Sequence, residues 1–224
     1  MDEKSIQTGT AIALPIPVPA MQLFSHRATN ALLALLADNP YALFGVRDLA
    51  RATDYTHKTI SDAVVDLAAA DLVETSHEGP KKLVQINRAR LDNPDDPILR
   101  IPQPEFHEPV SALLDRLREN LEDIRGIVLF GSVARGEADR RSDIDCFVLV
   151  ADHQATNQQH AHELTSDLSE QRFSGDRYKF HVLVESLEST QNYGERLRDI
   201  FATGLTLVDS ESLRTLKQEV LANG

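Results

Sequence analysis

The chain has 224 residues, of which 42% are hydrophobic and 26% are charged. This ordinary globular composition excludes a collagen-like, low-complexity or wholly disordered protein, and the length suits one large domain or two small ones. The 35 Asp and Glu residues outnumber the 23 Lys and Arg residues, which gives a formal net charge of −12. That balance excludes a protein that coats nucleic acid with uniform positive charge, so any DNA contact must be local.

Residue usage gives further expectations about the cellular setting. Arg outnumbers Lys 17 to 6 and Asp outnumbers Glu 20 to 15, a bias similar to that of halophile proteins from salt-rich cytoplasms. The single cysteine, Cys146, lies in an apolar run and is expected to be a core residue, which excludes a secreted disulfide scaffold. The start of the chain lacks the basic region of a signal peptide, and no apolar run is long enough to span a bilayer. We therefore expect a cytoplasmic protein.

Charge and proline content divide the chain into segments. Residues 21–91 carry equal numbers of acidic and basic side chains, whereas residues 92–224 have a net charge of −11. Four prolines fall within residues 94–104, where they cannot continue a helix or a central strand. We predict an extended arm over residues 1–20, a first domain over 21–91, a linker over 92–107 and a second domain over 108–224.

The first domain is predicted to contain three helices followed by a hairpin. Apolar spacing and capping residues predict helices from Ser25 to about residue 38, over 46–52 and over 56–70. Two short apolar runs, residues 72–75 and 83–86, flank a Gly-Pro turn and predict a hairpin with a basic side. This order of elements resembles a winged helix-turn-helix domain.

The resemblance to a winged helix implies double-stranded DNA as a partner. The third helix would enter the major groove, and Lys81 and Lys82 on the hairpin would contact phosphates. The helix residues predicted to contact DNA are Thr56, His57, Lys58, Thr59 and Ser61. A DNA-binding domain with little net charge would bind weakly alone, and two copies on a palindromic site would add affinity, so we expect a homodimer. In the structural alternative Thr56 only caps the helix, the lysines are solvated, and the domain contacts protein.

The second domain contains a glycine-serine turn between two apolar runs. Residues 127–130 lead into Gly131 and Ser132, and a second apolar run covers residues 144–150. Glycine lets the backbone approach a ligand closely, and a helix that begins at Ser132 would point N–H groups at an anion. A triphosphate is the anion that this turn suits.

Asp143 and Asp145 stand two residues apart at the start of the second run. Alternate residues of a strand point to one face, so both carboxylates emerge together while Ile144 faces the other way. Neighbouring carboxylates repel each other unless a cation lies between them, and oxygen donors suit Mg²⁺ bound to triphosphate. The pair therefore predicts Mg²⁺ together with a nucleoside triphosphate (NTP) such as ATP.

Gly131-Ser132, ten intervening residues and the Asp-x-Asp pair resemble the signature of the DNA polymerase beta-like nucleotidyltransferase superfamily, in its minimal branch. The resemblance covers about residues 108–208 and implies a mixed sheet flanked by helices. The expected fold class is thus α/β (α+β), with a winged helix-turn-helix before a nucleotidyltransferase-like domain. The resemblance also implies that Gly131, Ser132 and Arg135 bind the nucleotide phosphates and that the two aspartates hold Mg²⁺.

The family's third carboxylate stands on a later strand, which here covers residues 177–185, and His181 falls at its expected position. Glu185 shares a strand face with His181 and would supply a displaced carboxylate, or neutral His181 would act as the base. In the structural alternative, His181 is an ordinary partly buried histidine and Glu185 starts the next helix.

Two functions follow from these patterns. In the first, the protein is a Mg²⁺-dependent nucleotidyltransferase that transfers a nucleoside monophosphate to a hydroxyl of a protein or nucleic-acid acceptor. The family resemblance adds an antitoxin-like role with a toxin partner. In the second, the protein is a transcription regulator whose second domain senses nucleotide or only dimerises, as a missing third carboxylate would allow.

Overall fold

The computed structural model describes residues 10–16, 18, 23, 27–92, 95–192 and 194–223. The fold is α/β, as predicted, and its contacts divide into two compact units. The first, called the sheet unit here, consists mainly of Asn93–Tyr193 and Gly204–Leu213; the second, the helical unit, consists of Thr10–Asp92, Gly194–Thr203 and Arg214–Gly224. Within the described ranges, no helix has both the length and the apolar character needed to cross a membrane.

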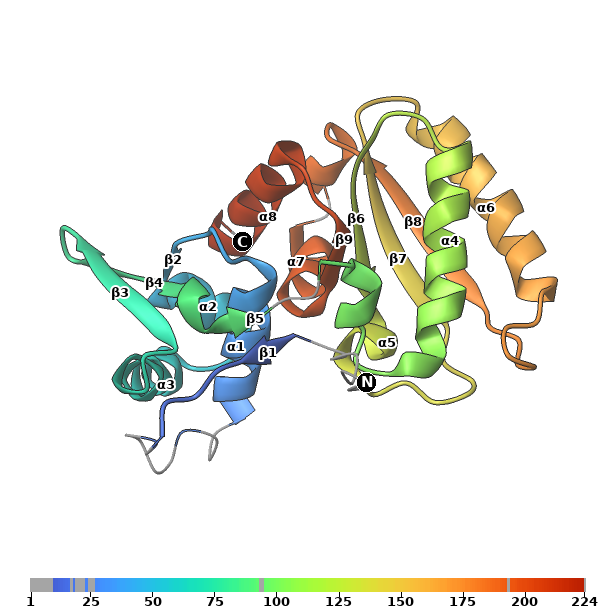
Figure 1. The fold of residues 1–224 in the computed structure, drawn as a ribbon. Helices are drawn as coiled ribbons and strands as arrows, with labels where there is room; N and C mark the ends of the chain where they lie inside the picture. Colours follow the sequence, from blue (N-terminus) through green and yellow to red (C-terminus); the bar gives the residue numbers. More distant parts are fainter. Residues whose placement is uncertain are drawn as a thin grey trace. The chain divides into compact units, whose positions relative to one another are not determined.

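A four-stranded mixed sheet forms the centre of the sheet unit (Figure 1). Its strands are β6 (Ile124–Phe130), β7 (Ile144–Val150), β8 (Phe180–Ser186) and β9 (Leu205–Val208), in the order β8-β7-β6-β9. β7 and β8 run parallel, and β6 is antiparallel to both of its neighbours, β7 and β9. The end of β6 therefore lies beside the starts of β7 and β8.

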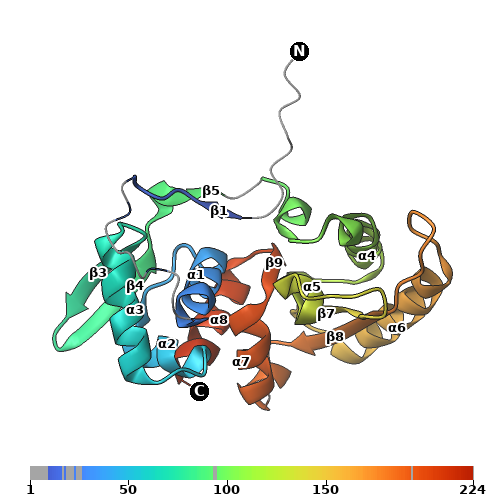
Figure 2. The same cartoon turned by 90° about the horizontal axis from the view of Figure 1, so that it is seen from below.

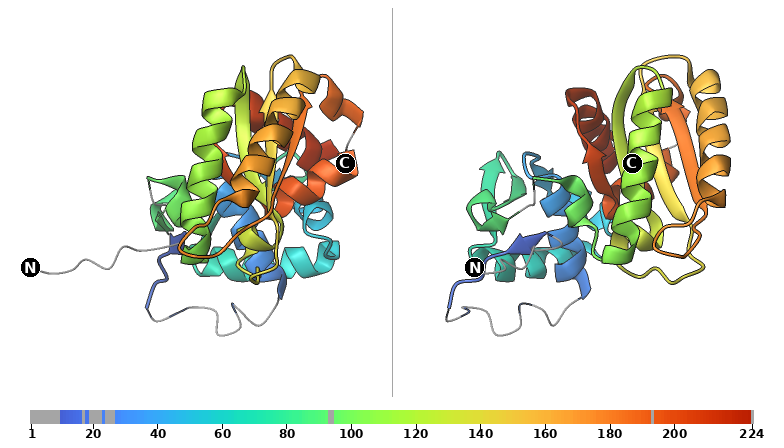
Figure 3. Two further views of the ribbon diagram at one scale, coloured as in Figure 1. Left: turned by 90° about the vertical axis from the view of Figure 1, so that its right-hand side faces the viewer. Right: turned by 45° about the vertical axis from the view of Figure 1, so that its right-hand side comes forward.

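Helices α4 (His107–Asn120) and α6 (Gln154–Glu170) flank this sheet (Figure 3). The unit also contains the short helix α5 (Gly131–Arg135) and the 3₁₀ turns η2 (Pro97–Arg100), η3 (Pro104–Phe106) and η4 (Ser189–Asn192). Side chains at alternate positions of β7, such as Ile144 and Cys146, join α4 and α6 in one apolar core. Cys146 is fully buried there, as predicted, and burial raises the pKa of its thiol.

Two glutamines of α6 protect the edge of the sheet. Gln158 donates from Nε2 to the Val182 carbonyl at 3.1 Å and accepts from the Val184 N–H at 2.9 Å. Gln154 donates to the Val184 carbonyl at 3.2 Å. An exposed strand edge is a template for unwanted pairing, and these amides occupy the groups that a further strand would use.

The helical unit contains the predicted helices and hairpin: α1 (Arg27–Asp38), β2 (Phe44–Gly45), α2 (Val46–Ala52), α3 (His57–Ala69), β3 (Val73–Glu78) and β4 (Lys81–Ile86). Its sheet has the order β2-β4-β3. The predicted N-cap Ser25 lies outside the described residues. Part of the predicted arm forms a strand, because β1 (Ala11–Ile12) pairs with β5 (Leu91–Asp92), as Figure 2 shows.

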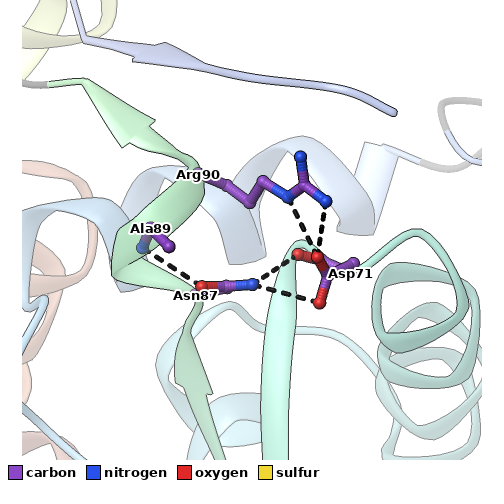
Figure 4. Close-up of polar contacts among 4 residues, drawn as sticks. All are labelled: Asp71, Asn87, Ala89 and Arg90. Carbon is purple, nitrogen blue, oxygen red and sulfur yellow. Dashed lines mark hydrogen bonds and ion pairs between the residues drawn. The ribbon is translucent and has the colours of Figure 1, made fainter. Parts of the chain in front are cut away.

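Polar contacts fix the chain where β4 ends, before the 3₁₀ turn η1 (Arg88–Arg90) (Figure 4). Asn87 donates to the backbone and side-chain oxygens of Asp71 at 2.9 and 3.1 Å, and Arg90 binds the same carboxylate through Nε and Nη2. Asp71 has a φ of 59°, a left-handed conformation that asparagine and aspartate tolerate better than other side chains. The network holds the turn between α3 and β3 against the end of β4.

Two C-terminal helices complete the helical unit. α7 (Gly194–Thr203) packs against α1 and α2 and buries Leu197, Ile200 and Phe201. α8 (Glu211–Asn223) contributes Lys217, whose Nζ lies 2.6 Å from Asp38 Oδ2 with both side chains almost completely buried. The sequence pattern assigned these segments to the domain at 108–224, whereas their contacts place residues 194–203 and 214–224 with the helical unit.

Candidate active site

The glycine at the end of β6 makes room for an aspartate. Phe130 pairs with Asp145 across β6 and β7, and Gly131 follows with a φ of +77°, a conformation that glycine adopts without strain. A Cβ on Gly131 would lie 2.7 Å from Asp145 Oδ2, closer than van der Waals contact allows. The turn and the carboxylate therefore approach each other only because residue 131 has no side chain.

Asp143 and Asp145 lie on one face at the start of β7. Ile144 between them is buried in the core, while Asp143 is exposed and the side chain of Asp145 keeps 25% of its surface exposed. Partial burial is the main cause that raises the pKa of Asp145, and the charge of Asp143 raises that pKa further, whereas His181 lowers it. The two carboxylates therefore stand close enough for their charges to interact.

His181 lies directly opposite Asp145 in the parallel pairing of β7 and β8. Its Nδ1 is 3.4 Å from Asp145 Oδ1, and its side chain is 58% exposed. His181 is therefore not the partly buried histidine of the structural alternative. The imidazole stands beside the aspartate pair with most of its surface open to a ligand.

Glu185 does not join this group, contrary to the expectation that it supplies a displaced carboxylate. It pairs with Leu149, four residues beyond the Asp145–His181 pair, a separation of roughly 13 Å from strand rise. The side chain is buried, and one oxygen accepts from Gln154 Nε2 at 2.7 Å and from Ser189 Oγ at 2.6 Å. Glu185 also belongs to β8 rather than starting a helix, so both sequence-based roles for it are wrong.

The loop from α5 to Asp143 is organised by its own polar groups. Asp139 accepts a hydrogen bond from the backbone N–H of Arg141, which is the main cause that lowers the pKa of Asp139. Arg135, predicted to bind phosphate, has its Nε 2.8 Å from Glu137 Oε2, with both side chains largely exposed. An exposed pair of this kind contributes little stability and opens easily when an anion competes.

The segment before β8 contains two basic side chains that are not part of the predicted site. Residues 177–181 alternate between exposed and buried, so Arg177, Lys179 and His181 are exposed while Tyr178 and Phe180 enter the core. The Ile144 N–H donates to the Lys179 carbonyl at 2.8 Å, which sets Lys179 beside Asp143. A period-two pattern of basic and aromatic residues in the sequence is the signal that would have found them.

The residues predicted to contact DNA lie on two elements of the helical unit. Thr56 caps α3, with its hydroxyl accepting from the Thr59 N–H at 3.2 Å. His57 and Lys58 are exposed, and Thr59 and Ser61 are half-buried. On β4, Lys82 is half-buried, and Lys81 Nζ lies 3.2 Å from Asp48 Oδ2.

Part of the sheet unit is similar in sequence to a known protein family. Residues 110–192 match the family model described as "Nucleotidyltransferase domain". The sheet unit is thus similar to nucleotidyltransferase domains over these residues. Asp143, Asp145 and His181 all lie inside this range, as do Gly131 and Ser132. A search of curated proteins found no match for the chain.

Two solved structures have local similarity to the chain. One is described as a toxin-antitoxin with AMP-PNP and is 26% identical, with 50% of this chain and 82% of that chain covered and a TM-score of 0.37. The other is a mutant of the toxin-antitoxin MntA-HpeT, 23% identical, with the same coverage and the same TM-score.

Proposed function

We propose that the nucleotidyltransferase domain binds Mg²⁺ and an NTP and transfers the nucleoside monophosphate to a hydroxyl of a protein or nucleic-acid acceptor. The observation that carries this proposal is the contact between the Asp145 carboxylate and the glycine turn, with Asp143 on the same face. A turn without side chains beside two carboxylates suits a polyphosphate that arrives with its metal.

The donor set fits Mg²⁺. Asp143 and Asp145 offer hard oxygen ligands. The space next to Asp145 Oδ2 is open because Gly131 has no Cβ there. Among the described residues, no group of three or more His, Cys, Asp or Glu side chains is arranged to hold a metal ion. Mg²⁺ typically uses one or two carboxylates together with substrate phosphates, so an aspartate pair is sufficient. When bound, the metal would neutralise phosphate charge and polarise phosphate oxygens.

The transfer itself forms one bond and breaks another. The acceptor hydroxyl oxygen bonds to the α-phosphorus, the bond from that phosphorus to the α,β-bridging oxygen breaks, and pyrophosphate leaves. The backbone at Gly131 and Ser132 would hold the leaving phosphates. His181 would take the hydroxyl proton, because Asp145 beside Nδ1 favours the tautomer that leaves Nε2 as the acceptor.

The experiment compares label transfer from α-³²P-ATP with Mg²⁺ and cell lysate. Wild-type protein should label an acceptor, and Asp143→Asn/Asp145→Asn should reduce the label by about a hundred-fold or more. Asp152→Asn/Asp167→Asn is the matched control, because it removes the same charge from exposed positions outside the site. Transfer that persists in the Asp143/Asp145 variant would refute the proposed active site.

The alternative function remains a regulator whose sheet unit senses nucleotide or dimerises without turnover. It would be supported by Mg²⁺-dependent ATP binding in the wild type with no transfer to any fraction of the lysate. An antitoxin-like role, in which a toxin is the acceptor, is likewise a prediction from the family resemblance. Labelling of one co-expressed protein partner would support it.

We propose as a second function that the helical unit is a winged helix that binds double-stranded DNA as a homodimer. The exposure of Thr56, His57 and Lys58 at the start of α3 favours this proposal. Exposed Asp62 on the same helix opposes it, since an acid on a reading helix repels phosphates.

The DNA proposal is tested with opposite charge changes on α3 and on the hairpin. Lys58→Glu/Lys82→Glu should weaken DNA binding and reduce its salt dependence, whereas Asp62→Asn should strengthen it. Lys81 is left unchanged because of its ion pair with Asp48. DNA affinity that is unaffected by all three changes would remove this surface from the proposal.

A further inference from the structure

The candidate site has unlike charges on its two sides. On the β6 side, the glycine turn approaches Asp145, and Arg135 at the end of the short helix that follows is paired with Glu137. On the β8 side, Arg177 and Lys179 are exposed on the same face as His181. In the described part of the chain, neither cation forms an ion pair with a carboxylate or a side-chain hydrogen bond. Two unpaired cations beside an active site that itself needs carboxylates call for an anionic ligand.

We infer that Arg177 and Lys179 bind backbone phosphates of a polynucleotide whose terminal hydroxyl is the acceptor. This inference rests on the proposed function, because the direction of attack follows from it. In phosphoryl transfer the attacking and leaving oxygens lie roughly in line. If the leaving pyrophosphate lies on the β6 side with Gly131 and Ser132, the hydroxyl enters from the β8 side. Arg177 and Lys179 line that entry.

The register of the two parallel strands fixes this placement. His181 pairs with Asp145, and Lys179 is set beside Asp143 through the hydrogen bond from the Ile144 N–H. Arg177 comes two residues earlier on the exposed side of the same extended segment. The cations therefore form a row that leads to His181, the residue proposed to take the hydroxyl proton. A strand whose last phosphates lie along this row would present its terminal hydroxyl at the aspartate pair.

The surroundings favour a polynucleotide over a protein acceptor. Protein interfaces are centred on apolar and aromatic side chains, whereas phosphate backbones are held by cations. In the described residues of the sheet unit, Leu187 is the only large hydrophobic side chain classed as exposed, and it follows the far end of β8. The exposed loop residues Arg140 and Arg141 add cations next to Asp143, although Asp139 and Asp176 offset part of this charge.

The test measures binding of a fluorescein-labelled single-stranded RNA 12-mer and of an ATP analogue to the full chain. Arg177→Gln/Lys179→Gln removes two positive charges, and Arg118→Glu at the end of α4 changes the net charge by the same two units as a matched control. RNA affinity should fall by about ten-fold in the double variant and stay within about two-fold in the control. The salt slope of RNA binding should fall by about 1.4, as expected for two lost single-strand phosphate contacts. Unchanged affinity for the ATP analogue shows that the variant is folded and that the cations do not serve the nucleotide.

Transfer from α-³²P-ATP then separates the two proposals. Label in RNA that is lost with Arg177→Gln/Lys179→Gln and with Asp143→Asn/Asp145→Asn supports both. Label that depends on Asp143 and Asp145 but appears in protein, or RNA affinity that is equal in the double variant and the control, overturns the polynucleotide acceptor and leaves the transferase intact. Label that survives the loss of both aspartates overturns the transferase site itself.

Discussion

Two carboxylates on the same face of the sheet have opposite environments. Glu185 near the end of β8 is buried, and its charge is matched by donors from Gln154 and Ser189. Asp145 at the start of β7 keeps a quarter of its side chain exposed, has its pKa raised by burial and by Asp143, and faces a glycine turn and an exposed histidine. A buried acid that accepts hydrogen bonds from neighbouring side chains serves the fold, whereas an acid kept beside a like charge serves a ligand.

Of the variants at these carboxylates, Asp145→Asn should have the largest effect. Transfer should fall by about a hundred-fold or more, since a proposed metal ligand is lost. Thermal stability without ligands should rise, because the raised pKa means that ionised Asp145 costs the folded state. That cost is absent below the ordinary value of 3.8 and grows as the pH rises through the folded-state pKa. Melting curves should show an advantage of the variant that grows upward from pH 4 and levels off once Asp145 is ionised in the folded state, and a variant less stable than wild type at pH 8 would contradict the assignment.

His181→Asn tests the proposed role of the histidine on the neighbouring strand. Loss of the proposed base should lower transfer by about a hundred-fold, within the usual range for general base catalysis. The affinity for Mg²⁺ and an ATP analogue should change little, because the imidazole is assigned to the hydroxyl rather than to the phosphates. Single-turnover transfer and equilibrium binding measure the two effects, and equal losses in both would make His181 a nucleotide ligand.

Gly131→Ala should damage stability and transfer together. The left-handed φ costs alanine about 1 kcal/mol, and the added methyl must displace Asp145 from a 2.7 Å contact. Gly175→Ala is the control, since residue 175 also has a positive φ but its Cβ meets nothing within 4 Å. Urea unfolding should show the larger loss for Gly131→Ala, and only that variant should lose transfer. Similar behaviour of both variants would mean that the close approach to Asp145 is unimportant.

Glu185→Gln should show the smallest effect on chemistry. Both donors reach the same oxygen, so the amide can keep its carbonyl there and loses only the charge, and stability should fall by about 1 kcal/mol. Transfer should remain within about two-fold of wild type. Glu188→Gln, an exposed neighbour, should change neither quantity. A large loss of transfer with normal stability would return Glu185 to the active site.

Local patterns in the sequence predicted those parts of the site that are formed by residues close together in the chain. The glycine turn and the shared face of Asp143 and Asp145 follow from backbone freedom and strand alternation over a few residues. Alternation also put Glu185 on the face of His181, but it could not show which of the two residues the register places opposite Asp145. The partners Gln154 and Ser189 come from separate segments, so no spacing in the sequence reveals them.

The helices of the hairpin region were predicted from apolar spacing, and their bounds agree with the structure within two residues. The unit against which α7 packs was not predicted, because an amphipathic pattern indicates that one face of a helix is buried but not which neighbour covers it. Likewise, the buried pair of Lys217 and Asp38 joins residues 179 positions apart. Charge alone would have assigned both side chains to the surface.

Parallel reactions with α-³²P-ATP and γ-³²P-ATP, each with Mg²⁺ and the same acceptor fraction, distinguish transfer of a nucleoside monophosphate from phosphorylation. Transfer of a nucleoside monophosphate predicts label in the acceptor from the α-phosphate only, with labelled pyrophosphate released from the γ-labelled substrate. Incorporation of the γ-phosphate would mean that the protein phosphorylates its acceptor, and it would contradict the assignment of Asp143 and Asp145 to nucleotidyl transfer.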